Sequence, residues 1–289
     1  MPTVSERAAV HLLDSESLGV FDVRCFAPAG GPGSEELPDV TQVVMPIGGV
    51  FEVHRGSASV VADAASVVVL AAGREHRVGH PGEGGDRSLV LVFPPDVLEG
   101  AIDPDGTPGG PVSSRVHLGA RILHSSLRRE AVDEMEAEDL GVRLLDLIVG
   151  DLDRACSLQP PGRHQRDRVE RVRALLAAAP ERRWRLAELA RAVHCSPFHL
   201  ARQFRALIGV SIATSLLRLR LALALERLAE GEADLAGLAA DLGFANHSHM
   251  SARFRSVFGV SPSSVRDSLP SGRLAELRTM VTAENSVAP

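Results

Sequence analysis

The sequence predicts an α+β protein of more than one domain: an N-terminal antiparallel β-barrel followed by helices, then a C-terminal all-α domain with two helix-turn-helix motifs. Short apolar runs separated by turn residues predict the barrel. Two helical segments that are copies of each other predict the C-terminal domain. The charge divides at the same place, with an acidic N-terminal part and a basic C-terminal part. A chain of 289 residues is long enough for two hydrophobic cores.

The N-terminal part shows apolar runs at 50–54 (VFEVH), 65–70 (ASVVVL) and 88–93 (SLVLVF), divided by Gly, Pro and Asp clusters. This pattern is typical of an antiparallel sandwich or barrel. Residues 118–156 then turn helical, with an apolar stripe that we expect to pack in the core, a dimer interface being the alternative. The stripe consists of Leu140, Leu144, Leu147, Ile148 and Leu152. We therefore expect a domain at 1–156, a linker at 157–168, a DNA-binding domain at 169–270 and a tail at 271–289.

The C-terminal repeat pairs residues 186–211 with 235–261. The first halves align at an offset of 49 residues and the second halves at 50, so the extra residue falls between two helical patterns, where a turn absorbs it. A continuous helical stretch at 211–229 connects the copies. At about 1.5 Å per residue it would hold two recognition helices near the 34 Å spacing of successive major grooves.

Each copy has residues suited to capping its second helix and to forming the turn before it. Ser196 and Asn246 can cap the second helix of their copy, Pro197 suits a first turn, and Gly243 suits the turn of the second copy. With the larger apolar side chains packed inward, the rest of each second helix can face DNA. A plain helical bundle with solvated arginines is the alternative. The predicted DNA-binding residues are Ser196, Pro197, Phe198, His199, Arg202, Gln203, Arg205, Asn246, His247, Ser248, Ser251, Arg253 and Arg255.

The chain is net acidic at −6, but residues 1–162 hold 12 Arg against 25 acids, and residues 163–270 hold 17 Arg against 10. A basic module beside an acidic domain is typical of DNA binding, and we expect that binding to reside in 163–270. No transmembrane run or signal peptide is found, so a cytoplasmic location is expected. The three cysteines are scattered without a CxxC pair, which favours reduced thiols.

The C-terminal hundred residues resemble the DNA-binding domain of AraC/XylS-type transcription regulators through SPFHLARQFRALIGVS (196–211), Arg220, the pair Gly243 and Phe244, and FGVSPSSVR (258–266). The resemblance implies a sequence-specific regulator of double-stranded DNA, an activator with RNA polymerase as a partner, and no enzymatic activity. A homodimer stays open. Four positions depart from the usual pattern of the family: His194, Ser215, Met250 and Ala252.

The N-terminal segments MPIGGVFEVHRG (45–56), VLAAGREHRVGHP (69–81) and GGDRSLVLVF (84–93) resemble the cupin-like barrel that such regulators use to sense effectors. We expect an unknown small-molecule effector, no cofactor and no metal, since no His-x-His pair precedes the C-terminal domain. Alternation puts two of the four candidates, Glu52 and His54, on one strand face, and if Phe51 and Val53 face inward the pocket lies elsewhere. A metal-dependent cupin enzyme fused to a DNA-binding domain is the rival interpretation. The predicted effector residues are Glu52, His54, His76 and Arg77.

Overall fold

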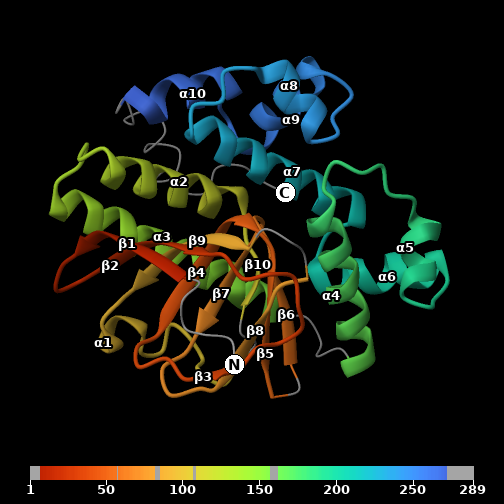
Figure 1. Ribbon diagram of the computed structural model, residues 1–289, viewed down its shortest axis with the longest axis horizontal. Coiled ribbons are helices and arrows are strands. Elements are labelled where there is room, and N and C mark those ends of the chain that lie inside the picture. Colours follow the sequence, from red (N-terminus) through yellow and green to blue (C-terminus); the bar gives the residue numbers. More distant parts are fainter. Residues whose placement is uncertain (1–6, 57, 82–84, 107–108, 157–161, 272–289) are drawn as a thin grey trace.

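The structure, a computed structural model, describes residues 7–56, 58–81, 85–106, 109–156 and 162–271 (Figure 1). Its N-terminal part contains two antiparallel sheets. The six-stranded sheet has the order β1-β2-β9-β4-β7-β10, and the four-stranded sheet has the order β3-β8-β5-β6. The strands are β1 (Arg7–Asp14), β2 (Gly19–Cys25), β3 (Glu35–Glu36), β4 (Gln42–Gly49), β5 (Phe51–Arg55), β6 (Ala58–Ala62), β7 (Ser66–Leu70), β8 (His76–Gly79), β9 (Asp86–Val92) and β10 (Gly109–Pro111).

Both faces of the six-stranded sheet are buried. Val44, Val68 and Val90 point toward the smaller sheet, where they pack with Phe51 and Val53. Their neighbours along the same strands point the other way, toward helices, among them Val43, Val67 and Leu89. Burial on both faces explains why β7 and β9 are nearly continuous apolar runs, since a sheet with one wet face would alternate strictly.

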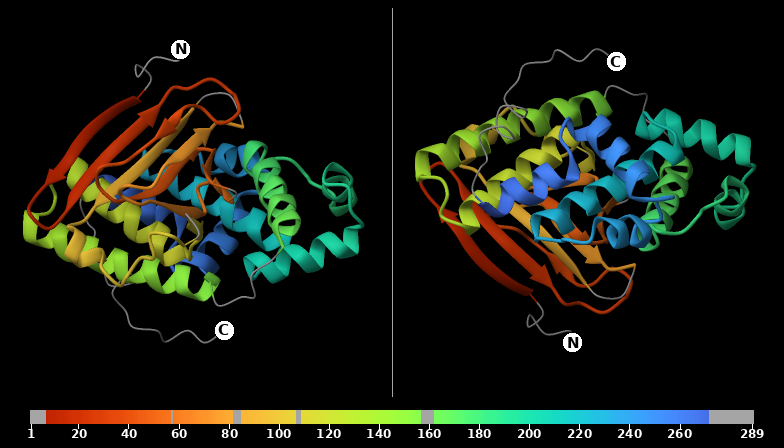
Figure 2. Two further views of the ribbon diagram at one scale, coloured as in Figure 1. Left: turned by 90° about the horizontal axis from the view of Figure 1, so that it is seen from below. Right: turned by 90° about the horizontal axis from the view of Figure 1, so that it is seen from above.

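Helices cover the outer face of the six-stranded sheet and form the rest of the described chain (Figures 1 and 2). The predicted helical stretch 118–156 is divided, because Glu130 adopts a left-handed φ of 53° between two helices. Leu140, Leu144 and Ile148 are buried, which confirms the core prediction for that stripe. The helices are α1 (Pro95–Leu98), α2 (Ser114–Arg128), α3 (Glu134–Cys156), α4 (Arg163–Ala178), α5 (Leu186–Ala192), α6 (Pro197–Ile208), α7 (Ile212–Ala229), α8 (Leu235–Asp241), α9 (His247–Phe258) and α10 (Pro262–Ser271).

The two halves of the C-terminal region pack differently. Helices α4, α5 and α6 enclose a core of their own around Phe204, and this unit projects to one side (Figure 2). The second half shares one continuous core with the N-terminal part, because Leu225 of α7, Phe254 of α9 and Leu269 of α10 belong to the same cluster as Ile122 of α2. The stability of this second half therefore depends on the N-terminal domain.

The predicted boundaries need two adjustments. The linker predicted at 157–168 ends earlier, because α4 begins at Arg163. Residues 157–161 lie outside the described range. Of the predicted tail 271–289, Ser271 ends α10 and the remainder lies outside the described residues.

Within the described ranges, no single helix is long and apolar enough to cross a membrane. Helices α6 and α7 meet the length and composition criteria only when taken together, and they are bent by 54° at the break between them.

Candidate functional site

The first helix-turn-helix unit consists of α5, a turn at His194, and α6. His194 has a φ of 51°, so it takes the left-handed conformation that histidine adopts more readily than most non-glycine residues. The Ser196 hydroxyl accepts a hydrogen bond from the His199 N–H at 3.2 Å, and Pro197 occupies the first turn of α6. Leu200 and Phe204 are fully buried, whereas Leu186, the first residue of α5, is 40 % exposed.

The second unit repeats this geometry with α8, a turn at Gly243 (φ 72°) and α9. The Asn246 side chain accepts a hydrogen bond from the His249 N–H at 2.8 Å, which confirms the predicted cap. Met250, Phe254 and Phe258 are buried, as predicted. Both second helices end at a left-handed glycine.

Most predicted DNA-binding residues have accessible side chains. His199 and Ser251 are half-buried, and Ser251 bonds to His247 Nε2 at 3.0 Å. The exposed members are Ser196, Pro197, Phe198, Arg202, Arg205, Asn246, His247, Ser248, Arg253 and Arg255. Phe198 is 78 % exposed at the start of α6, an unusual place for a large apolar ring unless it meets a partner.

The sequence predicts that Gln203 contacts DNA, and the structure contradicts this. Gln203 is buried at 7 % exposure, and its amide oxygen accepts a hydrogen bond from Arg168 Nη1 at 2.9 Å. Gln203 therefore joins α6 to α4. Conversely, sequence reasoning missed His249, which is exposed on α9 beside Phe244. Its position within the first turn of the recognition helix was the available signal.

Helix α7 connects the two units, and Arg220 on it reaches both. The Arg220 guanidinium donates to the carbonyl oxygens of Pro180 (2.6 Å) and Arg182 (3.0 Å), just before α5, and to that of Gly243 (3.0 Å), in the second turn. Gly243 has no room for a side chain, because a Cβ would lie 2.2 Å from the Glu181 carbonyl oxygen. The loop before α5 and the turn of the second unit thus meet against the middle of α7.

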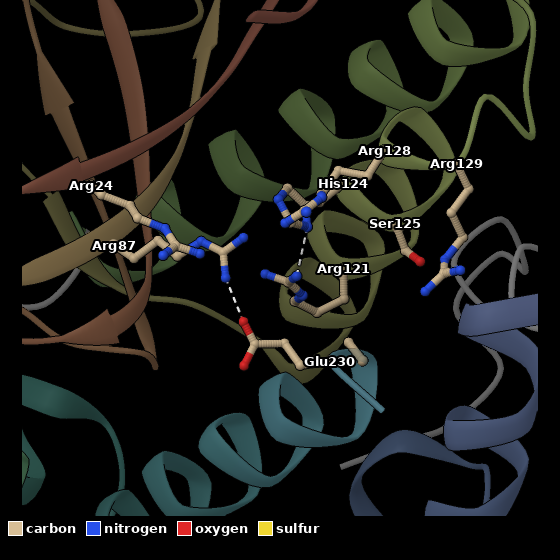
Figure 3. A pocket seen from close by; sticks show the side chains of 9 residues that line it. Arg24, Arg87, Arg121, His124, Ser125, Arg128, Arg129 and Glu230 are labelled. Atoms are coloured by element: carbon tan, nitrogen blue, oxygen red, sulfur yellow. Dashed lines mark hydrogen bonds and ion pairs between the residues drawn. The ribbon is translucent and has the colours of Figure 1, made fainter. Parts of the chain in front are cut away.

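A cavity of about 430 Å³ lies where β2, β9, α2 and the end of α7 meet (Figure 3). It is lined by one acid and mostly basic side chains. The lining consists of Arg24, Arg87, Arg121, His124, Ser125, Arg128, Arg129, Ala229 and Glu230. Arg121, His124 and Ser125 are buried at its base, and Arg24, Arg128 and Arg129 are exposed around it.

Several of these cations are held by acids at the cavity wall. Arg87 donates to both carboxylate oxygens of Asp22, at 2.8 and 2.6 Å, and also contacts Glu230 of α7. Burial alone would raise the pKa of Asp22, but hydrogen bonds from Arg87 and His124 outweigh it and hold that pKa well below its usual range. The wall therefore carries a fixed negative charge that orients Arg87.

The other arginines of the cavity have weaker partners, or none among the described residues. Arg24 and Arg129 make no ion pair or hydrogen bond there, and Arg128 lies only within 3.7 Å of Asp22. Arg121 Nη1 is 2.7 Å from Glu226 Oε2, but the pair lacks hydrogen-bond geometry. The cavity thus presents unsatisfied donors and an excess of positive charge, a combination suited to an anion.

The predicted effector residues do not line this cavity. Glu52 and His54 share a strand face and contact each other at 3.3 Å, while Phe51 and Val53 are buried between the sheets. Arg77 is exposed and paired with Glu35. His76 is buried, but it lies on β8 in the smaller sheet. His54 lies directly opposite Arg77, so Glu52, His54 and Arg77 share one face of β5 and β8, apart from the buried His76 and outside the cavity. That these four residues bind the effector stays a prediction.

Comparisons with known proteins agree with the helix-turn-helix assignment. Residues 189–268 match the family of helix-turn-helix domains. The chain is 37 % identical over 87 residues to an AraC-like transcription regulator of Streptomyces antibioticus, covering 30 % of this chain and 29 % of that protein. It is 34 % identical over 101 residues to the HTH-type transcriptional regulator YidL of Escherichia coli K12, covering 35 % and 34 %. The aligned segments thus span about a third of these relatives, and residues 189–268 form a helix-turn-helix domain similar to that of AraC-like regulators.

The solved structures that the chain matches include an apo form of ToxT from Vibrio cholerae that carries a single substitution. The TM-score is 0.38 at 16 % identity, and the match covers 89 % of this chain and 99 % of that one. Wild-type ToxT with bound unsaturated fatty acid gives a TM-score of 0.34 at 16 % identity and coverage of 91 % and 95 %. The AdpA DNA-binding domain in complex with target DNA gives 0.35 at 23 % identity, covering 36 % and 95 %.

Proposed function

We propose that this chain is a sequence-specific DNA-binding transcription regulator whose two recognition helices, α6 and α9, enter successive major grooves. The observation that carries the proposal is the duplicated helix-turn-helix connected by α7, with exposed polar and basic faces on both second helices. An 18-residue helix is about 27 Å long, close to the distance between neighbouring major grooves on one side of DNA.

The wider regulatory role is part of the same proposal. The protein acts in the cytoplasm as an activator that contacts RNA polymerase, alone or as a homodimer, and it is not an enzyme. The AraC-type domain supports this reading over a metal-dependent cupin enzyme, because that domain is shared with regulators.

Selection from random double-stranded DNA with the full chain tests the function. The full chain is needed because α7 to α10 share their core with the N-terminal domain. We expect one enriched consensus with two half-sites about one helical turn apart. Binding to that consensus should weaken steeply with salt, since arginine contacts to phosphates release counterions. Enrichment of no consensus, or binding that salt does not weaken, contradicts the proposal.

The arginine-lined cavity is the effector site of this regulator. Five arginines line it, and the acids that pair with them are Asp22, Glu226 and Glu230. Full ionisation of these acids leaves two positive charges uncompensated. We therefore expect a ligand with two negative charges, such as a dicarboxylate or a phosphate ester, whose oxygens receive the planar guanidinium donors in pairs.

The cavity also couples the ligand to the DNA-binding region. Glu230 follows the last residue of α7 and contacts Arg87 of β9, so the same arginine holds the ligand wall and the end of the helix that connects the two recognition units. An anion bound to Arg87 competes with Glu230 and loosens α7 from the sheet. Effector binding should therefore change DNA affinity, and by linkage DNA should change effector affinity by the same factor.

Titration of the full chain with succinate and inorganic phosphate, and with acetate as a singly charged control, tests the effector site. The two multiply charged anions should bind more tightly than acetate. Arg24→Ala and Arg129→Ala should each weaken binding about fivefold to tenfold, because neither arginine has a partner among the described residues. Arg143→Ala, at an exposed arginine of α3 outside the cavity, is the control and should have no effect. If both the Arg24 and the Arg129 variants bind these anions as tightly as the wild type does, the cavity is not the anion site.

A further inference from the structure

Three possible metal ligands converge at one end of the six-stranded sheet. Cys25, the last residue of β2, lies directly opposite Asp86, the first residue of β9, and His80 approaches both from the end of β8. One ligand atom from each residue lies within 4.8 Å of the other two. Cys25 and His80 are nearly buried, at 8 % and 6 % exposure.

The backbone holds these three residues in place. His80 exchanges two backbone hydrogen bonds with Gly30, at 2.8 and 3.0 Å. Gly85 adopts a φ of 69° next to Cys25, and a Cβ there would lie 2.0 Å from the Cys25 carbonyl oxygen. Only glycine fits this approach, so the chain before Asp86 is pressed against the end of β2. The position of the thiol relative to Asp86 is therefore fixed by main-chain packing.

We propose that Cys25, His80 and Asp86 bind a zinc ion, with water as a fourth ligand. One thiolate, one imidazole and one carboxylate form a donor set that zinc accepts in tetrahedral geometry. Metal–ligand distances of about 2.0 to 2.3 Å put tetrahedral ligand atoms about 3.3 to 3.8 Å apart, below the 4.8 Å within which these atoms lie. His80 Nε2 and Asp86 Oδ1, which are 2.8 Å apart, would separate slightly to admit the ion.

The surrounding charges are compatible with a cation. A zinc ion with one thiolate, one carboxylate and a neutral imidazole is close to neutral overall, which reduces the cost of burial. The basic side chain opposite Cys25 on β1, Arg7, is held by both oxygens of Glu36 at 2.8 Å and also interacts with the Cys25 thiol, a contact that zinc would replace. Asp86 is oriented by hydrogen bonds from Ser88 (3.2 Å) and with His80 (2.8 Å), and zinc would replace the second of these.

The metal site adjoins the effector cavity along both strands. Arg24 precedes Cys25 on β2, and Arg87 follows Asp86 on β9, so zinc would fix the pairing of the two strands that carry these arginines. This role goes beyond DNA binding. Zinc affinity is measured directly on the protein. The zinc proposal is therefore tested independently of the proposed regulatory function.

Metal analysis of the full chain, purified without chelators and supplied with zinc, tests the proposal. We expect one zinc per chain. Cobalt in its place should give the thiolate charge-transfer band and the visible bands of a four-coordinate site. Cys25→Ser should abolish the charge-transfer band and weaken zinc affinity more than about 100-fold, since even loss of an outer partner costs about 10-fold to 100-fold. Ser88→Ala, which removes an outer partner of Asp86, should weaken zinc affinity by about 10-fold to 100-fold.

Two controls keep the result interpretable. Cys195→Ser, at a cysteine outside the sheet, should leave zinc content and the cobalt spectrum unchanged. Zinc should also slow alkylation of Cys25 in the wild-type chain, mapped by mass spectrometry, a readout that needs no variant to fold. Absence of stoichiometric zinc, equal affinity in Cys25→Ser, or alkylation of Cys25 at the same rate with and without zinc overturns the proposal.

Discussion

The Glu226 carboxylate lies 2.7 Å from Arg121 Nη1, with both side chains nearly buried, and the contact joins α7 of the DNA-binding region to α2 of the N-terminal domain. On its other side, Arg121 donates to His124 Nδ1 at 2.7 Å, and His124 Nε2 lies 3.0 Å from Asp22 on β2. Because an arginine can only donate, His124 is neutral with its proton on Nε2. A continuous series of polar contacts thus runs from Asp22 in the sheet through His124 and Arg121 to Glu226 in α7.

The first prediction concerns acid. Burial lowers the pKa of His124 to about 4, and the hydrogen bond to Asp22 only partly opposes this. Between pH 6.5 and 4 the unfolded chain takes up a proton that folded His124 refuses, so stability falls as the pH falls, by at most about 3 kcal/mol. Urea unfolding at several pH values should show a smaller loss across this window in His124→Gln. A loss of equal size in the variant contradicts the assignment.

The second prediction concerns Glu226, which makes stability fall as the pH rises. Burial raises the pKa of Glu226 to about 7, although Arg121 opposes the shift. Between pH 4.5 and 7 the folded chain keeps a proton that the unfolded chain releases, so this residue lowers stability as the pH rises. Glu226→Gln should therefore gain stability relative to the wild type from about pH 5 to about pH 8, by up to about 3 kcal/mol. A difference that stays constant with pH would show that Glu226 is ionised throughout.

The DNA-binding units could be predicted in detail because their signals are local. The internal repeat, the Ser196 and Asn246 caps and the glycine turn depend on residues a few positions apart, and the structure places them as expected. Gln203 was misjudged because its burial depends on Arg168 of α4, which the α6 sequence does not reveal. Helix periodicity puts it at the edge of the buried face.

The effector cavity could not be predicted in the same way. Period-two alternation placed Glu52 and His54 on one face but could not say which face is interior. The cavity combines Arg24 and Arg87 from the sheet with Arg121 from α2 and Glu230 from α7, positions brought together only by tertiary packing. Arg121, flanked on α2 by Leu118, Ile122 and Leu123, was the one local signal, because a buried arginine needs a partner.

The third prediction concerns the first turn. The φ of 51° at His194 carries a left-handed backbone strain of about 1 to 2 kcal/mol, and glycine would remove it at some cost in unfolded-state entropy. His194→Gly should therefore raise the free energy of unfolding by about 0.5 to 1 kcal/mol. His194→Val, with a β-branched side chain, should lower it. Equal stability of the two variants would mean that the backbone at this turn is not left-handed.

The fourth prediction concerns Arg220, whose three hydrogen bonds join the loop before α5 to the turn of the second unit. Arg220→Ala should destabilise the protein by about 1.5 to 3 kcal/mol, because charged donors are lost and carbonyl groups are left unpaired. Arg218→Ala, at an exposed neighbour on α7, should stay within about 0.5 kcal/mol of the wild type. Denaturant unfolding measures both, and similar losses in the two variants would argue against a connecting role for Arg220.

The last prediction separates base contacts from phosphate contacts. Arg202 is exposed one turn into α6, so we expect it to reach a base edge, and Arg202→Ala should cost about 1 to 3 kcal/mol and relax the preference at one position of the consensus. Arg205 and Arg255 lie in the last turns of their helices, where phosphates are nearer. Their alanine variants should lose affinity almost equally for all sequences and show a weaker salt dependence. Repeating the random-DNA selection with each variant distinguishes these outcomes, and an unchanged consensus with Arg202→Ala would place that residue on the phosphate backbone.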